Sequence, residues 1–158
     1  MPIGYAQGAA HGLSAFHTAV EASLDRIEAN LRGARAGRDP EFLHQLRVGL
    51  RRLRSALQAY RGLPGRASRK PLERSARALA RSLGAVRDWD VLLIRLGAMP
   101  GAAPLARRIR RERQAAQREL LKALSPASWR RFLALARTAR AAQAADTPAL
   151  ARKAMERA

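Results

Sequence analysis

The chain has 158 residues, which is long enough for one domain with a hydrophobic core and short for two. Its 47% apolar content consists largely of Ala and Leu, which favours helices over strands. The lack of cysteine excludes disulfides, thiolate nucleophiles and cysteine-ligated metal sites. The formal net charge of +19, from 31 basic and 12 acidic side chains, predicts an anionic partner.

Positive charge is concentrated outside the first 40 residues. That segment carries four basic and four acidic side chains, so the entire excess lies in residues 41–158. Of the 31 basic residues, 28 are Arg. A GC-rich genome would explain Arg in place of Lys, but it would not explain the excess of cations over anions. The guanidinium group pairs bidentately with phosphate oxygens, which fits a phosphate-rich partner.

Apolar residues recur at steps of three and four along most of the chain, which is typical of amphipathic helices that pack on one another. Short breaks with Gly and Pro separate these rows, which favours antiparallel neighbours. The predicted helices span about 13–32, 40–61, 69–97, 104–124 and a fifth beginning at Pro126. The segment Asp146-Thr147-Pro148 has the pattern of one further helix start. We therefore expect an all-α antiparallel bundle of about five to six helices.

We expect one helical domain over residues 1–158, in which residues 1–12 are flexible. The first 14 residues lack the basic start and unbroken apolar run of a secretion signal. No window reaches the ~18 apolar residues of a membrane span. Mutual packing of the apolar rows also leaves little surface for lipid. A cytoplasmic protein without a membrane partner is the resulting expectation.

The clearest candidate site lies in the second predicted helix. A basic row recurs there at steps of three and four: His44, Arg47, Arg51 and Arg54. Each member follows a Leu of the apolar row, so at ~100° per residue the four share a face that flanks the core. Surface arginines usually pair with carboxylates one turn away. No Asp or Glu occurs between His44 and Arg69, so the row is expected to face an external anion.

The third predicted helix carries a second basic row at similar spacing. Its members are Lys70, Arg74, Arg77 and Arg81, with Glu73 as the only nearby acid. Two such rows on neighbouring helices could face one groove, which would concentrate positive potential. Guanidinium groups in that groove would bind a flexible polyanion phosphate by phosphate, and this binding needs no catalytic group.

Two carboxylates lie near the end of the third predicted helix. Asp90 takes a position in the apolar row, and Arg87 lies one turn before it, which predicts a buried ion pair between them. Asp88 is expected to share in this structural pairing. The alternative interpretation is that the carboxylates orient Arg87 toward a ligand.

The segments HQLRVGLRRLR at residues 44–54 and LGAVRDWDVL at residues 83–92 occur in this order on the second and third predicted helices. Together they resemble the conserved histidine α-helical domain family, called CHAD, and the resemblance runs from about residue 13 to the C-terminus. Members of this family are helical domains that bind inorganic polyphosphate, associate with polyphosphate granules and have no known catalytic activity. The resemblance therefore implies polyphosphate contacts at the basic row of residues 44–54, at Arg87 and at the basic row of the third helix.

The chain departs from the family pattern in its number of bundles. CHAD domains typically consist of two similar helical bundles, each with its own His-and-Arg helix, whereas this chain has one such helix. We therefore expect it to correspond to the N-terminal bundle, with residues 147–158 as the start of an incomplete second bundle. Either the chain is a half-length version, or two copies pair in a homodimer that completes the site.

Two other classes of function fit parts of the sequence. The +19 charge would attract DNA or RNA at low salt, but aromatic residues make up only 4% of the chain and no base-reading helix is evident. A phosphate-cleaving enzyme would need carboxylates that share a metal, whereas Asp88 and Asp90, two positions apart on a helix, point to different sides. No activated nucleophile or Gly-rich phosphate loop accompanies them. We expect no catalysis, metal or cofactor, and nucleic acid only as a competing non-specific ligand.

Overall fold

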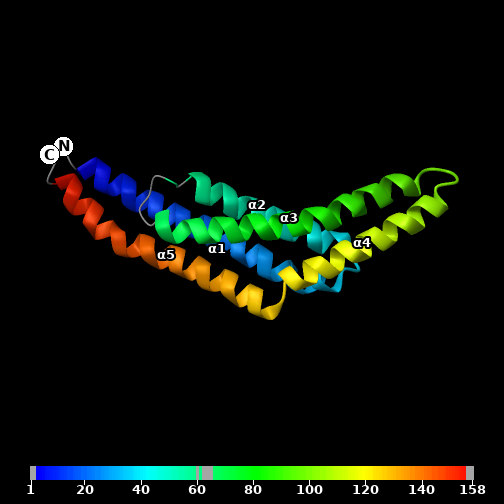
Figure 1. Ribbon diagram of the computed structural model, residues 1–158. Coiled ribbons are helices and arrows are strands. Elements are labelled where there is room, and N and C mark those ends of the chain that lie inside the picture. Colours follow the sequence, from blue (N-terminus) through cyan, green and yellow to red (C-terminus); the bar gives the residue numbers. More distant parts are fainter. Residues whose placement is uncertain (1–2, 60, 62–65, 156–158) are drawn as a thin grey trace.

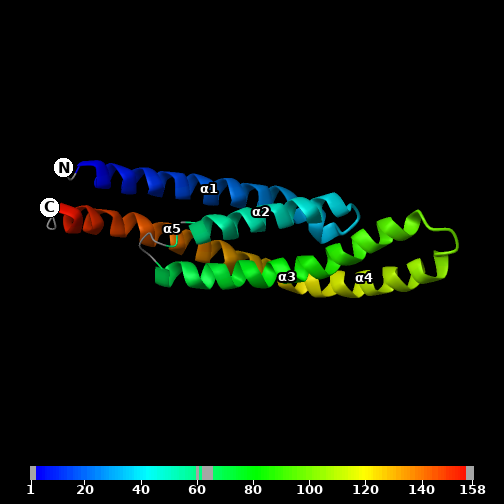
Figure 2. The same ribbon diagram turned by 90° about the horizontal axis from the view of Figure 1, so that it is seen from above.

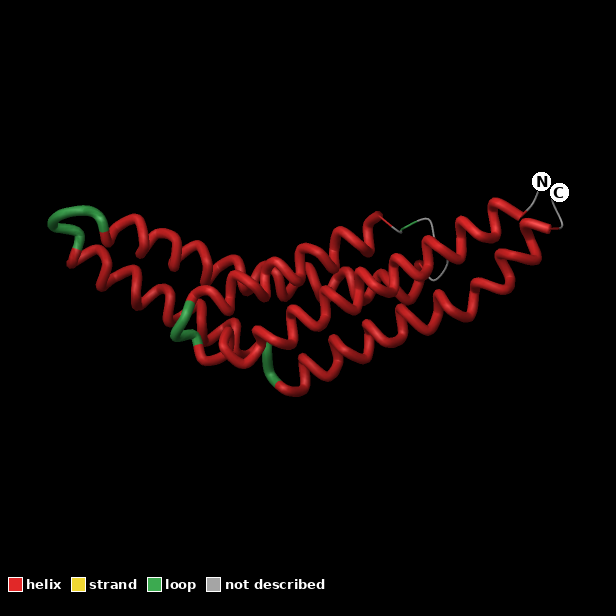
Figure 3. Tube along the Cα trace, turned by 180° about the vertical axis from the view of Figure 1, so that it is seen from behind, coloured by secondary structure: helices red, strands yellow, loops and turns green. Residues whose placement is uncertain are grey.

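The computed structural model describes residues 3–59, 61 and 66–155 of the chain, and nearly all of these residues are helical. Five helices follow one another: α1 (Ile3–Ala36), α2 (Pro40–Ala59), α3 (Arg66–Gly97), α4 (Ala103–Ala123) and α5 (Pro126–Met155). The described residues contain no strand, so the predicted all-α class is confirmed. Short turns join α1 to α2, α3 to α4 and α4 to α5 (Figure 3). None of the described helices is long and apolar enough to cross a membrane.

The helices form an elongated bundle (Figure 1). α1 and α2 make one antiparallel hairpin, α3 and α4 make a second, and α3 also packs against α2 and α5. α5 returns along α1, so the start of α1 and the end of α5 lie close together in Figures 1 and 2. At the opposite end the α3–α4 hairpin projects beyond α1 and α2. The core therefore lies in the middle of the molecule.

The core is built from the apolar rows that the sequence predicts. In α2 the row is buried along most of the helix: Leu43, Leu46, Leu50, Leu53 and Leu57. Its partners come mainly from α1 and α3: Phe16, Val20, Ile27, Leu31, Leu72, Ala76, Leu79, Leu83 and Val86. Full burial of one such large side chain stabilises the fold by about 1.5–3 kcal/mol. These rows therefore fix the rotation of each helix about its own axis.

α1 is longer at its N-terminus than the sequence predicts. It begins at Ile3 rather than near residue 13. Six of the ten residues from 3 to 12 are Gly or Ala, so this part of the helix carries no regular apolar row that could reveal it. The flexibility of residues 1–12 stays a prediction.

The predicted sixth helix is wrong, because α5 runs without a break through Asp146-Thr147-Pro148. Proline inside a helix costs about 3 kcal/mol relative to Ala, which is why this segment has the pattern of a new start. Six of the eleven residues from 141 to 151 are Ala, the strongest helix former, and they favour continuation. Residues 147–155 therefore continue α5.

α1 and α2 approach closely at Gly49, a buried residue of α2. A Cβ atom at this position would lie 2.7 Å from Ile27 Cγ1 and 3.2 Å from the backbone oxygen of Ser23, both in α1. A carbon atom so close to its neighbours would force the two helices apart. Gly49 therefore permits the crossing that positions α2 against the core.

We predict that Gly49→Ala destabilises the protein whereas Gly12→Ala does not. Both changes gain about 1 kcal/mol of helix propensity, but a Cβ at Gly12 would meet no atom within 4 Å. Overpacking at Gly49 is expected to cost about 1–3 kcal/mol. Urea unfolding followed by circular dichroism measures the free energy of unfolding of each variant, and equal stability would contradict the close crossing.

Candidate functional site

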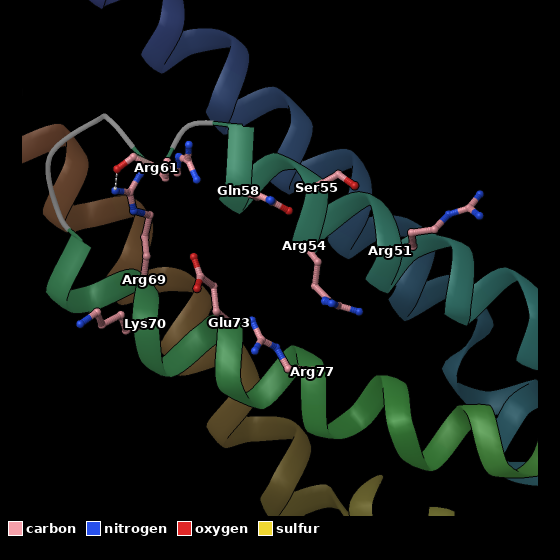
Figure 4. Close-up of a pocket in the computed structure, with 9 residues that line it drawn as sticks. All are labelled: Arg51, Arg54, Ser55, Gln58, Arg61, Arg69, Lys70, Glu73 and Arg77. Atoms are coloured by element: carbon pink, nitrogen blue, oxygen red, sulfur yellow. Dashed lines mark hydrogen bonds between the residues drawn. The ribbon is translucent and has the colours of Figure 1, made fainter.

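A groove with a volume of about 720 Å³ lies between α2 and α3, at the end where the chain passes from one helix to the other (Figure 4). Nine residues line it: Arg51, Arg54, Ser55, Gln58, Arg61, Arg69, Lys70, Glu73 and Arg77. Six of these residues are basic and one is acidic. The groove therefore brings basic side chains of both predicted rows to one place.

The walls of the groove follow from the register of the two helices. On both helices, lining residues come one position after a buried residue: Arg51, Arg54 and Gln58 on α2, and Lys70, Glu73 and Arg77 on α3. One position corresponds to ~100° of rotation about the helix axis. On each helix, the lining residues therefore lie about 100° around the axis from the buried row, at the edge of the core.

Arg69 joins α3 to the segment that follows α2. It is only 2% exposed, and its Nη2 donates a hydrogen bond to the backbone oxygen of Arg61 at 2.9 Å (Figure 4). Sequence reasoning predicts neither residue as part of the site. The sequence does contain a pattern that indicates burial of Arg69, because Arg69 lies three positions before Leu72 and so extends the buried row of α3. This buried contact ties α3 to the segment that follows α2 at one end of the groove.

Arg54 and Arg77 extend into the space between α2 and α3 from opposite walls of the groove in Figure 4. Glu73 points into the same space, whereas Arg51 points away from it at the rim. Among the residues whose side chains the structure describes, Glu73 takes part in none of the ion pairs. Arg54 and Arg77 likewise take part in none of these ion pairs among the described side chains, and their mutual repulsion favours a bound anion.

Five of the nine predicted contacts lie outside this groove: His44, Arg47, Arg74, Arg81 and Arg87. Arg47 is partly buried and reaches α3, where a Cβ on Gly84 would lie 3.2 Å from its Nη1. His44 and Arg87 are partly buried too, while Arg74 and Arg81 are exposed. The structure thus gathers four of the predicted residues in one groove, with Arg47 between the same two helices.

The buried carboxylate of α3 has a different partner from the one predicted. Asp90, which is 6% exposed, accepts a hydrogen bond from Arg113 Nε of α4 at 2.7 Å. The predicted pairing with Arg87 is therefore wrong, and Asp88 is exposed and does not share in the pair. Spacing along one helix cannot reveal a partner 23 positions away. Arg113 Nη2 also donates to the backbone oxygen of Gly37 at 3.1 Å, which ties α1 to the same pair.

The C-terminal ends of α1 and α4 cap one another next to this ion pair. Gln117 Nε2 of α4 donates to the backbone oxygen of Ala34 at 3.0 Å. In return, Arg35 of α1 donates through Nε to the backbone oxygen of Leu124 at 2.9 Å, and its Nη2 donates to the same oxygen. The last carbonyl groups of a helix have no partner within the helix, and these side chains supply one. The base of the α3–α4 hairpin is thereby fixed to α1.

The sequence model of the CHAD domain family matches residues 18–158, which is most of the chain. The matched region contains all nine residues that line the groove and both members of the Asp90–Arg113 pair. Comparisons with curated proteins and with solved structures give no match.

We predict that Arg113→Met destabilises the protein far more than Lys122→Met. Loss of Arg113 leaves the Asp90 carboxylate buried and unpaired, which is expected to cost about 3–5 kcal/mol. Lys122 forms an ion pair with Glu119 at 2.7 Å, but both side chains are exposed, so its loss is expected to cost less than about 1 kcal/mol. Urea unfolding measures both losses. Arg113→Met/Asp90→Leu should recover much of the stability, and equal single-variant losses would contradict the pairing.

Proposed function

Because the chain belongs to the CHAD domain family, we propose that it binds inorganic polyphosphate in the groove between α2 and α3 and carries out no reaction on it. The observation that supports this proposal most directly is the lining of the groove, with six basic side chains and a single carboxylate, Glu73. A linear chain of phosphates offers anionic oxygens along its whole length. Guanidinium groups pair with such oxygens through two parallel hydrogen bonds, which makes them well suited to hold it.

Arg54 and Arg77 are the proposed central contacts. They extend into the same space from opposite walls, so a phosphate chain that runs through the groove would meet a guanidinium group from each side (Figure 4). Arg51 and Lys70, farther out along the two walls, would bind phosphates beyond the central pair. The summed positive potential of the groove would draw the polyanion in, and salt would screen this attraction.

The proposed activity is binding without catalysis. Asp88 is exposed, Asp90 is held by Arg113, and neither carboxylate lines the groove. Glu73 is the one carboxylate among the lining residues, and in the described part of the chain no three His, Asp or Glu side chains gather as metal ligands. This arrangement supports a role in holding phosphates over a role in activating water to attack them.

We predict that Arg54→Glu/Arg77→Glu weakens polyphosphate binding by at least about a hundredfold. Each change removes a charge-assisted hydrogen bond worth about 1.5–3 kcal/mol and adds a repelling carboxylate to the groove. The matched control is Arg130→Glu/Arg131→Glu, which changes the net charge equally at exposed positions of α5 outside the groove. Isothermal titration calorimetry with polyphosphate of defined length measures both affinities.

Equal losses in the two double variants would contradict the proposed site, because they would show that net charge alone sets the affinity. Circular dichroism of both variants checks that the helices are retained. Glu73→Gln removes the only carboxylate among the lining residues and is expected to strengthen binding, since it relieves repulsion between the groove and phosphate.

Nucleic acid is the alternative polyanion. The net charge of +19 would attract it at low salt regardless of any specific site. Single strands are usually held by aromatic side chains on which bases stack. None of the nine lining residues is aromatic, and Trp129 stacks on Phe132 at a ring separation of 5.1 Å as part of the core. These observations favour a polyanion without bases.

We therefore predict that polyphosphate displaces duplex DNA at fixed ionic strength, well below an equal concentration of phosphate groups. We expect a flexible phosphate chain to enter the groove and a rigid duplex, which is far wider than a single phosphate chain, to contact only its rim. Fluorescence anisotropy of labelled DNA measures the displacement. Arg54→Glu/Arg77→Glu should lose this preference and keep weak, salt-dependent DNA binding. If duplex DNA instead displaces polyphosphate from the protein at equal phosphate concentration, the result would favour the alternative function.

Two further expectations from the sequence stay predictions. Association with polyphosphate granules follows from the family resemblance. The homodimer in which two copies complete one site is not required by the proposed groove, because one chain supplies all nine lining residues.

A further inference from the structure

The free end of the α3–α4 hairpin projects beyond the rest of the bundle (Figures 1 and 2). Arg113 contacts both Asp90 and Gly37, and these contacts attach the hairpin to the C-terminal end of α1. Residues 91–112, called the hairpin tip from here on, lie beyond this attachment. At ~1.5 Å per residue, the two helices of the tip extend it by about 10–15 Å.

Apolar side chains are exposed in the hairpin tip. Four large ones are 37% to 63% exposed: Leu92, Ile94, Met99 and Leu105. Among the other described side chains only two large apolar ones are exposed, so the tip holds most of this surface. Leu96 and Ile109 are buried inside the tip but do not belong to the main core. The two helices of the tip bury only these two large side chains, so its other large apolar side chains stay in contact with solvent.

The same tip is strongly basic. Five of its arginines are exposed: Arg95, Arg107, Arg108, Arg110 and Arg111. Glu112 is its only acidic residue. None of these residues lines the groove between α2 and α3, so the proposed polyphosphate site does not account for them. Arginines beside exposed apolar side chains fit a surface that is both anionic and apolar.

The exposed apolar side chains do not share one face of the hairpin. Leu92 and Ile94 are two positions apart on α3, so they point about 200° apart around the helix axis. A folded protein partner would cover one face and leave the other in water. A lipid surface that the tip enters would surround both. A second copy of the tip would bring two sets of five arginines together, which repel one another.

We propose that the hairpin tip docks on an anionic lipid surface. Its apolar side chains enter the boundary between headgroups and acyl chains, while its arginines bind headgroup phosphates and lay their alkyl stems along the apolar region. The sequence predicts that mutual packing leaves little apolar surface for lipid. At the hairpin tip, however, four large apolar side chains are exposed, because the tip lies beyond the helices that could cover it. The proposal is independent of polyphosphate binding.

The test is the partition of the purified chain onto vesicles, measured by flotation. The protein is expected to bind vesicles of phosphatidylcholine mixed with phosphatidylglycerol and not vesicles of phosphatidylcholine alone. Ile94→Gln/Met99→Gln is expected to lower this binding at least about tenfold, because it removes two inserting side chains. The matched control is Leu121→Gln, since Leu121 is exposed on α4 outside the tip. This control should bind as the wild type does.

A second measurement separates insertion from adsorption by charge. Brominated lipids should quench the added fluorescence of Met99→Trp and leave that of Leu121→Trp unchanged. Arg107→Gln/Arg110→Gln should weaken binding to anionic vesicles more than Arg130→Gln/Arg131→Gln, which removes the same charge from α5. Circular dichroism checks that each variant keeps its helices.

Three results would overturn the proposal. One is no binding to anionic vesicles by the wild type. Another is equal binding by Ile94→Gln/Met99→Gln and the wild type without quenching of Met99→Trp, which would leave charge alone as the cause. A third is a dimer in sedimentation that Ile94→Gln/Met99→Gln dissociates, which would identify the tip as a contact between copies. Polyphosphate affinity of this variant should stay unchanged, so failure of one proposal is distinguishable from failure of the other.

Discussion

Burial of the leucine row of α2 is the constraint on which the candidate site depends. Leu50, Leu53 and Leu57 are completely enclosed, so α2 cannot rotate about its axis without exposing them to water. The close crossing at Gly49 holds the same helix against α1. Residues one position after the leucines must then emerge at the edge of the core, beside α3. Apolar packing therefore places the basic groove, and the groove needs no attraction among its own side chains to form.

Buried charged side chains have partners in the structure, whereas exposed charged side chains of the groove do not need them. Inside, Asp90 is matched with Arg113, because an unpaired charge in the core would cost several kcal/mol. Arg69 is also enclosed and is held by the backbone oxygen of Arg61. In the groove, by contrast, Arg54 and Arg77 extend into the same space with no paired carboxylate among the described side chains. Water and salt screen the repulsion between these two cations, so their proximity costs little free energy. Their combined positive potential would attract a polyanion.

Periodicity predicts the helices and the basic rows because both depend on spacing along a single helix. It does not predict which members of a basic row line a groove. Arg74 and Arg81 belong to the basic row of α3, yet they lie outside the groove. Nor does it predict the partner of Asp90, because that partner lies on another helix. At Pro148 two local signals conflict, and the helix propensity of the surrounding alanines outweighs the pattern of a new start.

Mutual capping makes the ends of α1 and α4 a single cooperative unit. Arg35 and Leu124 are 89 positions apart, so their hydrogen bond closes a long loop, and the entropic cost of this closure falls once the helices between them have packed. If either helix end frays, the other loses partners for its last carbonyl groups, and the two should open together. In the hairpin tip, the buried Leu96 and Ile109 pack apart from the main core. The tip should therefore unfold locally at a lower free energy than the core, and this local opening would leave the groove between α2 and α3 in place.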